Sequence, residues 1–169
     1  LYQADKHAEP FWQPNETGGH LNEDYFGGDL KGIQMKLPYL REMGVDYLYL
    51  NPIFEAHSNH RYNTADYLNV DPLLGTNEDF ETLCAEARKY GIGIVLDGVF
   101  NHCGYWWDKF QDVVKNGKAS PYRSWFFIHS YPVDAEQQNY DCVGHYKWMP
   151  KLNLANPVSY THLTLPTKL

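Results

Sequence analysis

The chain has 169 residues, 43% of them hydrophobic, and a formal net charge of -7, which indicates a globular domain with a core rather than a disordered chain. The charge argues against a nucleic-acid partner or an anionic membrane surface, and no apolar run reaches the roughly 20 residues of a membrane span. The 14 Tyr, 8 Phe and 5 Trp suit a cleft that stacks on sugar rings, although a Tyr-rich surface without a ligand would have the same composition.

The start of the chain and its cysteines bear on the compartment. The segment Leu1 to Pro14 has no basic start and no apolar core, so no signal peptide is predicted. Because the first residue is Leu, we expect the true start to lie upstream. Cys84, Cys103 and Cys142 are far apart and form no CxxC pair, which favours thiols in a reducing compartment and a cytoplasmic protein.

The first predicted elements are a loop and a helix. Residues 1–26 are polar and read as a long loop. Asp29 is expected to cap a helix over residues 30–43, whose apolar residues recur on one face. Pro38 predicts a kink or strain within that helix, and Gly44 suits a left-handed C-cap.

The pattern then alternates between strands and helices. Residues 45–50 (VDYLYL) predict a strand, and a long polar loop follows over 51–75. Thr76, with Asp79 three residues on, predicts a capped helix that ends near Tyr90. Residues 92–96 (IGIVL) are a continuous apolar run, which predicts a strand buried on both faces.

This order indicates repeated βα units with a parallel sheet. A doubly wound open sheet is the rival architecture, but it requires a Gly-rich phosphate loop after an early strand. Gly27-Gly28 follows no predicted strand. Residues 103–157 leave the repeat and predict a small separate subdomain, because a structureless loop of this length is uncommon. Its aromatic residues are Trp106, Trp107, Trp125, Tyr131, Tyr140, Tyr146 and Trp148.

Residues 97–102 (DGVFNH) place an acid, an amide and an imidazole just past a buried strand. At the mouth of a barrel such a cluster orients sugar hydroxyls. An alternative is that Asp97 and Asn101 cap local backbone groups, as short polar side chains often do.

Residues 97–102 also resemble the first conserved region of the α-amylase family, glycoside hydrolase family 13. Three further segments resemble the family in the same order along the chain. They are FGGDLKGI at 26–33, LNPIF at 50–54 followed by NHRYNTADY at 59–67, and MPKLN at 149–153. The last is typical of the neopullulanase, cyclomaltodextrinase and maltogenic amylase branch.

The resemblance implies a partial (β/α)8 barrel of the α/β class that holds about strands 2–3 and helices 1–2. Residues 1–102 would form the barrel part, and 103–157 an inserted domain-B-like excursion. Residues 158–169 match nothing in the family and show no helical period. We interpret them as a non-native tail, with a natural variant tail as the alternative.

The resemblance also implies roles for individual residues. Tyr62 corresponds to the tyrosine that stacks on the glucose before the scissile bond, and His102 to the histidine that hydrogen-bonds that sugar. Asp97 corresponds to an acid that supports the site without being the nucleophile.

The supporting residues are Asn101, Asn63 and Asp66. Asn101 is expected to help hold its loop. Asn63 departs from the family, which usually has Asp at this position.

The implied reaction is retaining hydrolysis of α-1,4 and also α-1,6 bonds in maltodextrins, cyclodextrins or pullulan. It needs two carboxyl groups about 5–5.5 Å apart. The family carries its nucleophile in a Gly-x-Arg-x-Asp stretch that this chain lacks, so the fragment itself is expected to be inactive. The alternatives are a non-catalytic carbohydrate-binding module and an α-1,6-glucosidase or transglycosylase relative.

The expected partner is an α-glucan oligosaccharide, and a homodimer is one expectation for the parent enzyme. No cofactor is expected to be required. The histidines match no usual zinc pattern. A calcium ion is chemically feasible in the acidic N-terminal loop that holds Asn15, Asn22 and Asp24.

Overall fold

A computed structural model describes the backbone of residues 27–164 and the side chains of residues 27–161. These residues form two compact units. The first contains residues 27–61 and 69–97, and the second contains residues 62–68 and 98–164. Each unit has a hydrophobic cluster of its own. The family-based domain boundaries at residues 102 and 157 stay a prediction.

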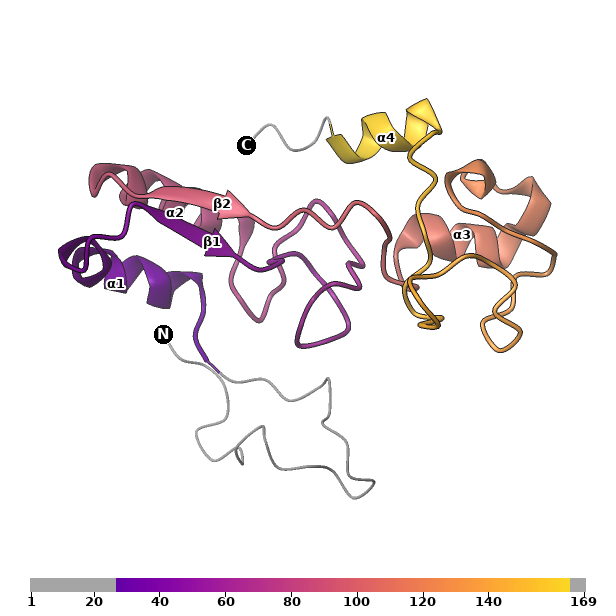
Figure 1. The fold of residues 1–169 in the computed structure, drawn as a ribbon, viewed down its shortest axis with the longest axis horizontal. Coiled ribbons are helices and arrows are strands. Elements are labelled where there is room, and N and C mark those ends of the chain that lie inside the picture. The colour runs from indigo at the N-terminus through magenta and orange to yellow at the C-terminus, as the bar shows by residue number, and fades with distance from the viewer. Residues whose placement is uncertain (1–26, 165–169) are drawn as a thin grey trace, which may run out of the picture. The chain divides into compact units, whose positions relative to one another are not determined.

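The first unit alternates helices and strands (Figure 1). Its two strands pair in parallel, with Tyr47 opposite Gly93 and Leu50 opposite Leu96. The predicted helices and strands are therefore confirmed, each shortened by one or two residues at its ends. In chain order the elements are α1 (Leu30–Glu42), β1 (Tyr47–Leu50), α2 (Asn77–Lys89) and β2 (Gly93–Leu96).

Side-chain caps begin both helices. Asp29 accepts a hydrogen bond from the Gly32 N–H at 2.7 Å. Thr76 and Asp79 form a reciprocal capping box, because each side chain accepts from the backbone N–H of the other. Pro38 lies exposed inside α1, and the helix continues through it. The helix thus tolerates the hydrogen bond that Pro38 cannot donate, and the predicted kink or strain stays a prediction.

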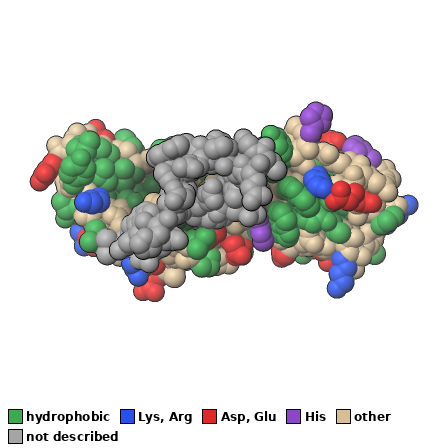
Figure 2. Space-filling model, turned by 90° about the horizontal axis from the view of Figure 1, so that it is seen from below, with side chains coloured by type: hydrophobic (Ala, Val, Ile, Leu, Met, Phe, Trp, Pro, Cys, Tyr) green, Lys and Arg blue, Asp and Glu red, His purple; other side chains and the backbone are tan. Residues whose placement is uncertain are grey.

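The core of the first unit lies on one face of the sheet. Leu37 of α1 and Leu83 of α2 are fully buried there, against alternate residues of both strands. The opposite face carries Tyr47, Tyr49 and Val95 with 72%, 61% and 41% exposure. The prediction of a strand buried on both faces is therefore wrong for the described residues, because their helices cover one face only. Figure 2 shows hydrophobic side chains at the surface of both units.

The second unit is built around aromatic rings. Phe110 is fully buried and meets Phe126 and Tyr140 edge-on, with ring centroids 4.9 and 5.0 Å apart. Isolated antiparallel bridges join its loops, among them His102 with Lys151. Its helices are α3 (Asp108–Asn116), the short 3-10 helices η1 (Gly117–Ala119) and η2 (Arg123–Trp125), and α4 (Pro157–Thr164).

The helix α4 was not predicted, because its sequence has no helical period. Asn156 caps its start, because the side-chain oxygen accepts from the N–H groups of Val158 and Ser159 at 2.9 and 3.3 Å. Pro157 at the first position already has the backbone angle that a helix needs. The helix therefore depends on its cap and not on an apolar period. None of the helices in the described residues has the length and apolar character needed to cross a membrane.

We predict that Leu83→Ala lowers the free energy of unfolding by about 2–5 kcal/mol, because it leaves a cavity in the core of the first unit. Leu73→Ala is the matched control, since Leu73 is 59% exposed, and should cost less than about 0.5 kcal/mol. Urea denaturation followed by circular dichroism measures both. Equal losses for the two variants would contradict this description of the core.

Candidate functional site

Tyr62 and His102 meet within the second unit. The Nε2 of His102 lies 2.8 Å from the Tyr62 carbonyl oxygen. Because a carbonyl oxygen only accepts, Nε2 carries the hydrogen and donates it. Nδ1 can then accept from the side-chain amide of Asn101 at 3.3 Å. The imidazole is thus held in one orientation, between the backbone of Tyr62 and the side chain of Asn101.

A glycine lets the two segments approach. The Gly104 N–H donates to the Thr64 carbonyl oxygen at 2.7 Å. A Cβ added at Gly104 would lie 2.2 Å from the Asn63 carbonyl oxygen, closer than real side chains come to backbone. Only glycine fits this position without moving the chain. Asn63 and Thr64 are both buried, so the segment has little room to yield.

Tyr67 ties the same segments together from the other end. Its hydroxyl lies 2.9 Å from the carbonyl oxygens of both Val99 and His102, which share its single hydrogen. Its ring meets Trp107 edge-on at 5.1 Å between centroids. Burial raises the pKa of Tyr67 well above its ordinary value, so the hydroxyl keeps its hydrogen at neutral pH. Tyr67 fixes the backbone of His102 and was missed by the sequence reasoning.

Asp97 belongs to the first unit, at the end of β2. Its N–H donates to the Leu50 carbonyl oxygen at 3.0 Å, which extends the parallel ladder by one residue. A hydrogen bond from the Tyr49 hydroxyl to the Asp97 carboxylate raises the pKa of Tyr49. The sequence reasoning did not single out Tyr49, which pairs with Val95 on the neighbouring strand, two residues before Asp97.

The other residues near the NHRYNTADY segment have structural partners. Asp66 accepts from the Leu68 N–H at 2.7 Å and forms a local turn. Arg61 forms a buried ion pair with Asp71, in which each side chain is 6% exposed. Arg61 has a left-handed backbone with φ of 64°. Arg61 directly precedes Tyr62 in the chain. The buried ion pair therefore fixes the backbone just before Tyr62.

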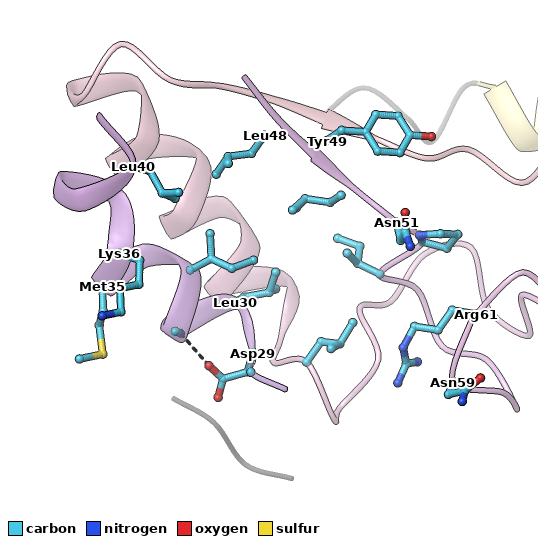
Figure 3. A pocket seen from close by; sticks show the side chains of 17 residues that line it. Asp29, Leu30, Met35, Lys36, Leu40, Leu48, Tyr49, Asn51, Asn59 and Arg61 are labelled. Carbon is cyan, nitrogen blue, oxygen red and sulfur yellow. Dashed lines mark hydrogen bonds between the residues drawn. The ribbon is translucent and has the colours of Figure 1, made fainter. Parts of the chain in front are cut away.

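The first unit also contains a pocket of about 900 Å³ between α1 and β1 (Figure 3). Leucine side chains from both elements point into it, and Asn51, Asn59 and Arg61 lie at its polar end. Neither the Tyr62–His102 pair nor Asp97 lines it. The pocket is mainly apolar and brings no pair of carboxylates together, so we do not assign the chemistry to it.

The family profile described as the catalytic domain of alpha amylase matches residues 5–157. The chain belongs to the α-amylase family. The resemblance inferred from four segments is thereby confirmed. The match ends at Pro157, so residues 158–169 lie outside it, and their non-native origin stays a prediction.

Several relatives from the α-amylase family are similar to the chain over most of its length. A cyclomaltodextrinase of Geobacillus thermopakistaniensis is 50% identical over 91% of this chain and 26% of its own length. An intracellular maltogenic amylase of Bacillus subtilis is 49% identical over 91% of this chain and 25% of its own. Neopullulanase 2 of Thermoactinomyces vulgaris is 46% identical over 80% of this chain and 24% of its own length. The chain thus spans about a quarter of the length of these relatives.

Solved structures agree with this assignment. The ligand-free cyclic α-maltosyl-(1→6)-maltose hydrolase of Arthrobacter globiformis has a TM-score of 0.82 and 41% identity, over 94% of this chain and 35% of that one. Its complex with maltose also has a TM-score of 0.82, over 94% of this chain and 36% of that one. The type III pullulan hydrolase of Thermococcus kodakarensis has a TM-score of 0.80 and 40% identity, over 85% of this chain and 25% of that one. The α/β fold is shared by these α-amylase-family enzymes.

No metal site was predicted, and calcium was judged chemically feasible only in the N-terminal loop. Asn15, Asn22 and Asp24 lie outside the described residues. Within residues 27–164, no group of three or more His, Cys, Asp or Glu side chains could hold a metal ion. The described residues therefore do not test calcium binding in that loop.

We predict that Gly104→Ala destabilises the second unit by about 1–3 kcal/mol, because the added methyl group forces the Asn63 carbonyl away. Gly28→Ala is the matched control, since a Cβ there meets nothing within 4 Å. Thermal unfolding of both variants measures the difference. A Gly104→Ala protein as stable as the control would contradict the close approach.

Alkaline pH should destabilise the fold through buried tyrosines. Burial raises the pKa of Tyr67 and of Tyr140 in the folded chain, while both should ionise near pH 10 in the unfolded chain. The contribution of the two tyrosines to the free energy of unfolding is fully present below about pH 10. It is lost as the pH rises toward their pKa values in the folded chain, by about 1.4 kcal/mol per pH unit for each residue.

Urea denaturation between pH 9 and about pH 11.5 tests this linkage. We expect Tyr67→Phe to flatten the fall in unfolding free energy above about pH 10. The exposed Tyr146 provides the control, and Tyr146→Phe should keep the full slope. The same slope in the wild-type chain and Tyr67→Phe would contradict the enclosed hydroxyl.

Proposed function

We propose that the chain is part of a retaining α-glucan hydrolase that cleaves α-1,4 and also α-1,6 bonds in maltodextrins, cyclodextrins or pullulan. The observation that carries this proposal is the hydrogen bond between His102 Nε2 and the Tyr62 carbonyl, inside the segment that matches the α-amylase family. The names of the relatives, which include cyclomaltodextrinase and neopullulanase, support the substrate class.

In this proposal Tyr62 and His102 bind one glucose unit. The tyrosine ring stacks on the apolar C–H face of the sugar. A sugar hydroxyl replaces the Asn101 amide as the donor to Nδ1 of His102, while Nε2 keeps its bond to the Tyr62 carbonyl. Asn101 and Tyr67 do not contact the sugar. They hold the side chain and the backbone of His102, so the imidazole is oriented before the sugar arrives.

Asp97 contributes as a supporting acid. Its carboxylate accepts from Tyr49 and so stays fixed at the end of β2. Retaining hydrolysis needs a nucleophile and an acid/base about 5–5.5 Å apart. The family's Gly-x-Arg-x-Asp stretch does not occur in these 169 residues, so the proposed activity belongs to a longer protein.

The proposed architecture is a (β/α)8 barrel in which β1 and β2 are the second and third strands. β1 pairs with β2 alone among the described residues, and the apolar pocket lies beside β1. Both features suit a sheet that continues beyond the free edge of β1. Residues 103–157 would then be the inserted domain-B-like excursion. The name of an intracellular relative supports a cytoplasmic location.

Calorimetry with maltotriose tests the proposed sugar site in the 169-residue chain. We expect binding that Tyr62→Ala and His102→Ala each weaken roughly 3- to 10-fold. Tyr39→Ala, which removes an exposed ring of the first unit, should bind as the wild type does. Equal weakening by Tyr39→Ala, or no maltotriose binding by the folded wild-type chain, would contradict the proposal.

The same chain should not hydrolyse cyclodextrin or pullulan, because it lacks the two carboxylates. A reducing-sugar assay on purified protein measures this. Turnover above the buffer control would show that the carboxylates lie within these 169 residues and that their assignment is wrong.

A further inference from the structure

Two tryptophans that are distant in the sequence stack at the surface of the second unit. The rings of Trp106 and Trp148 are 5.1 Å apart between centroids and tilted by 22°. Their residues remain 39% and 40% exposed. Tryptophan has the largest apolar side chain, and two stacked at the surface of the described residues form a flat apolar patch on which a ligand ring can stack.

Tyr105 holds the two tryptophans against the core of the second unit. The Tyr105 N–H donates to the Trp148 carbonyl oxygen at 2.9 Å. The Tyr105 ring meets Trp106 and Trp148 edge-on, at 5.7 and 5.3 Å between centroids. The same ring meets the buried Phe110 at 5.4 Å. Because the core sets both rings in place, a ligand would lose little free energy in ordering them.

The charges around the pair favour an uncharged ligand. The Nζ of Lys147 lies 4.8 Å from the centre of the Trp148 ring and forms an ion pair with Glu136 at 2.6 Å. The paired cation is therefore not available to hold an anion. Flat apolar rings beside polar groups match a sugar, which has apolar C–H faces and hydroxyls at its edge.

One strip of backbone links the tryptophan pair to the segment that follows Tyr62. The Gly104 N–H donates to Thr64, and the next N–H, that of Tyr105, donates to Trp148. A single short segment thus joins the residues after Tyr62 to the stacked rings.

We propose that Trp106 and Trp148 form a second contact site for the same α-glucan chain, beyond the glucose held by Tyr62 and His102. This inference rests on the proposed function and adds to it a surface that recognises chain length. The tryptophans bind by stacking and act on no bond.

Nuclear magnetic resonance on the 169-residue chain tests the second site. Maltoheptaose is titrated while the indole N–H signals of Trp106 and Trp148 and the imidazole signals of His102 are followed. We expect all three to move along one binding curve. In calorimetry, Trp106→Ala should weaken maltoheptaose binding roughly 3- to 10-fold. Phe127→Ala, which removes another exposed ring of this unit, should have no effect.

The possible outcomes separate the two proposals. If His102 moves and the indole signals do not, the second site is overturned and the proposed function stands. If neither moves, both are overturned. If the indole signals move with protein concentration but not with sugar, the tryptophans join copies of the chain and the second site is overturned. Because the titration uses the unaltered chain, a variant that fails to fold does not affect this reading.

Discussion

The contact between Gly104 and the carbonyls of Asn63 and Thr64 is the constraint on which the candidate site depends. It brings together two segments that are about forty residues apart in the sequence, with no room for a side chain between them. The hydrogen bond from His102 to Tyr62 and the two bonds of the Tyr67 hydroxyl follow from this approach. Loosening it would change the orientation of the imidazole and of the loop that carries Tyr62.

The secondary structure of the first unit could be predicted because its signals are local. Asp29, Thr76 and Asp79 make the caps that their spacing predicts, and the apolar periods place α1 and α2 correctly. The burial of β2 was overestimated, because burial depends on distant parts of the chain and not on a local signal. An apolar run shows what a strand can bury, but it does not show whether a partner covers each face. In the described residues Val95 remains 41% exposed.

The site could be predicted in part. Tyr62 and His102 were singled out by motif, and the structure brings them together. Asn101 was expected as a support, but Tyr67 and Gly104 were missed, because they act through contacts between segments that no local pattern reveals. The helix α4 was missed for a different reason, since it depends on one cap by Asn156 rather than on an apolar stripe.

The central claim is that Tyr62 and His102 together hold a single glucose unit. Nuclear Overhauser effects between bound maltotriose and the chain test it most directly. We expect protons of one glucose to show effects both to the Tyr62 ring and to the His102 imidazole. Effects to only one of the two residues, or to neither while maltotriose is bound, would contradict the claim.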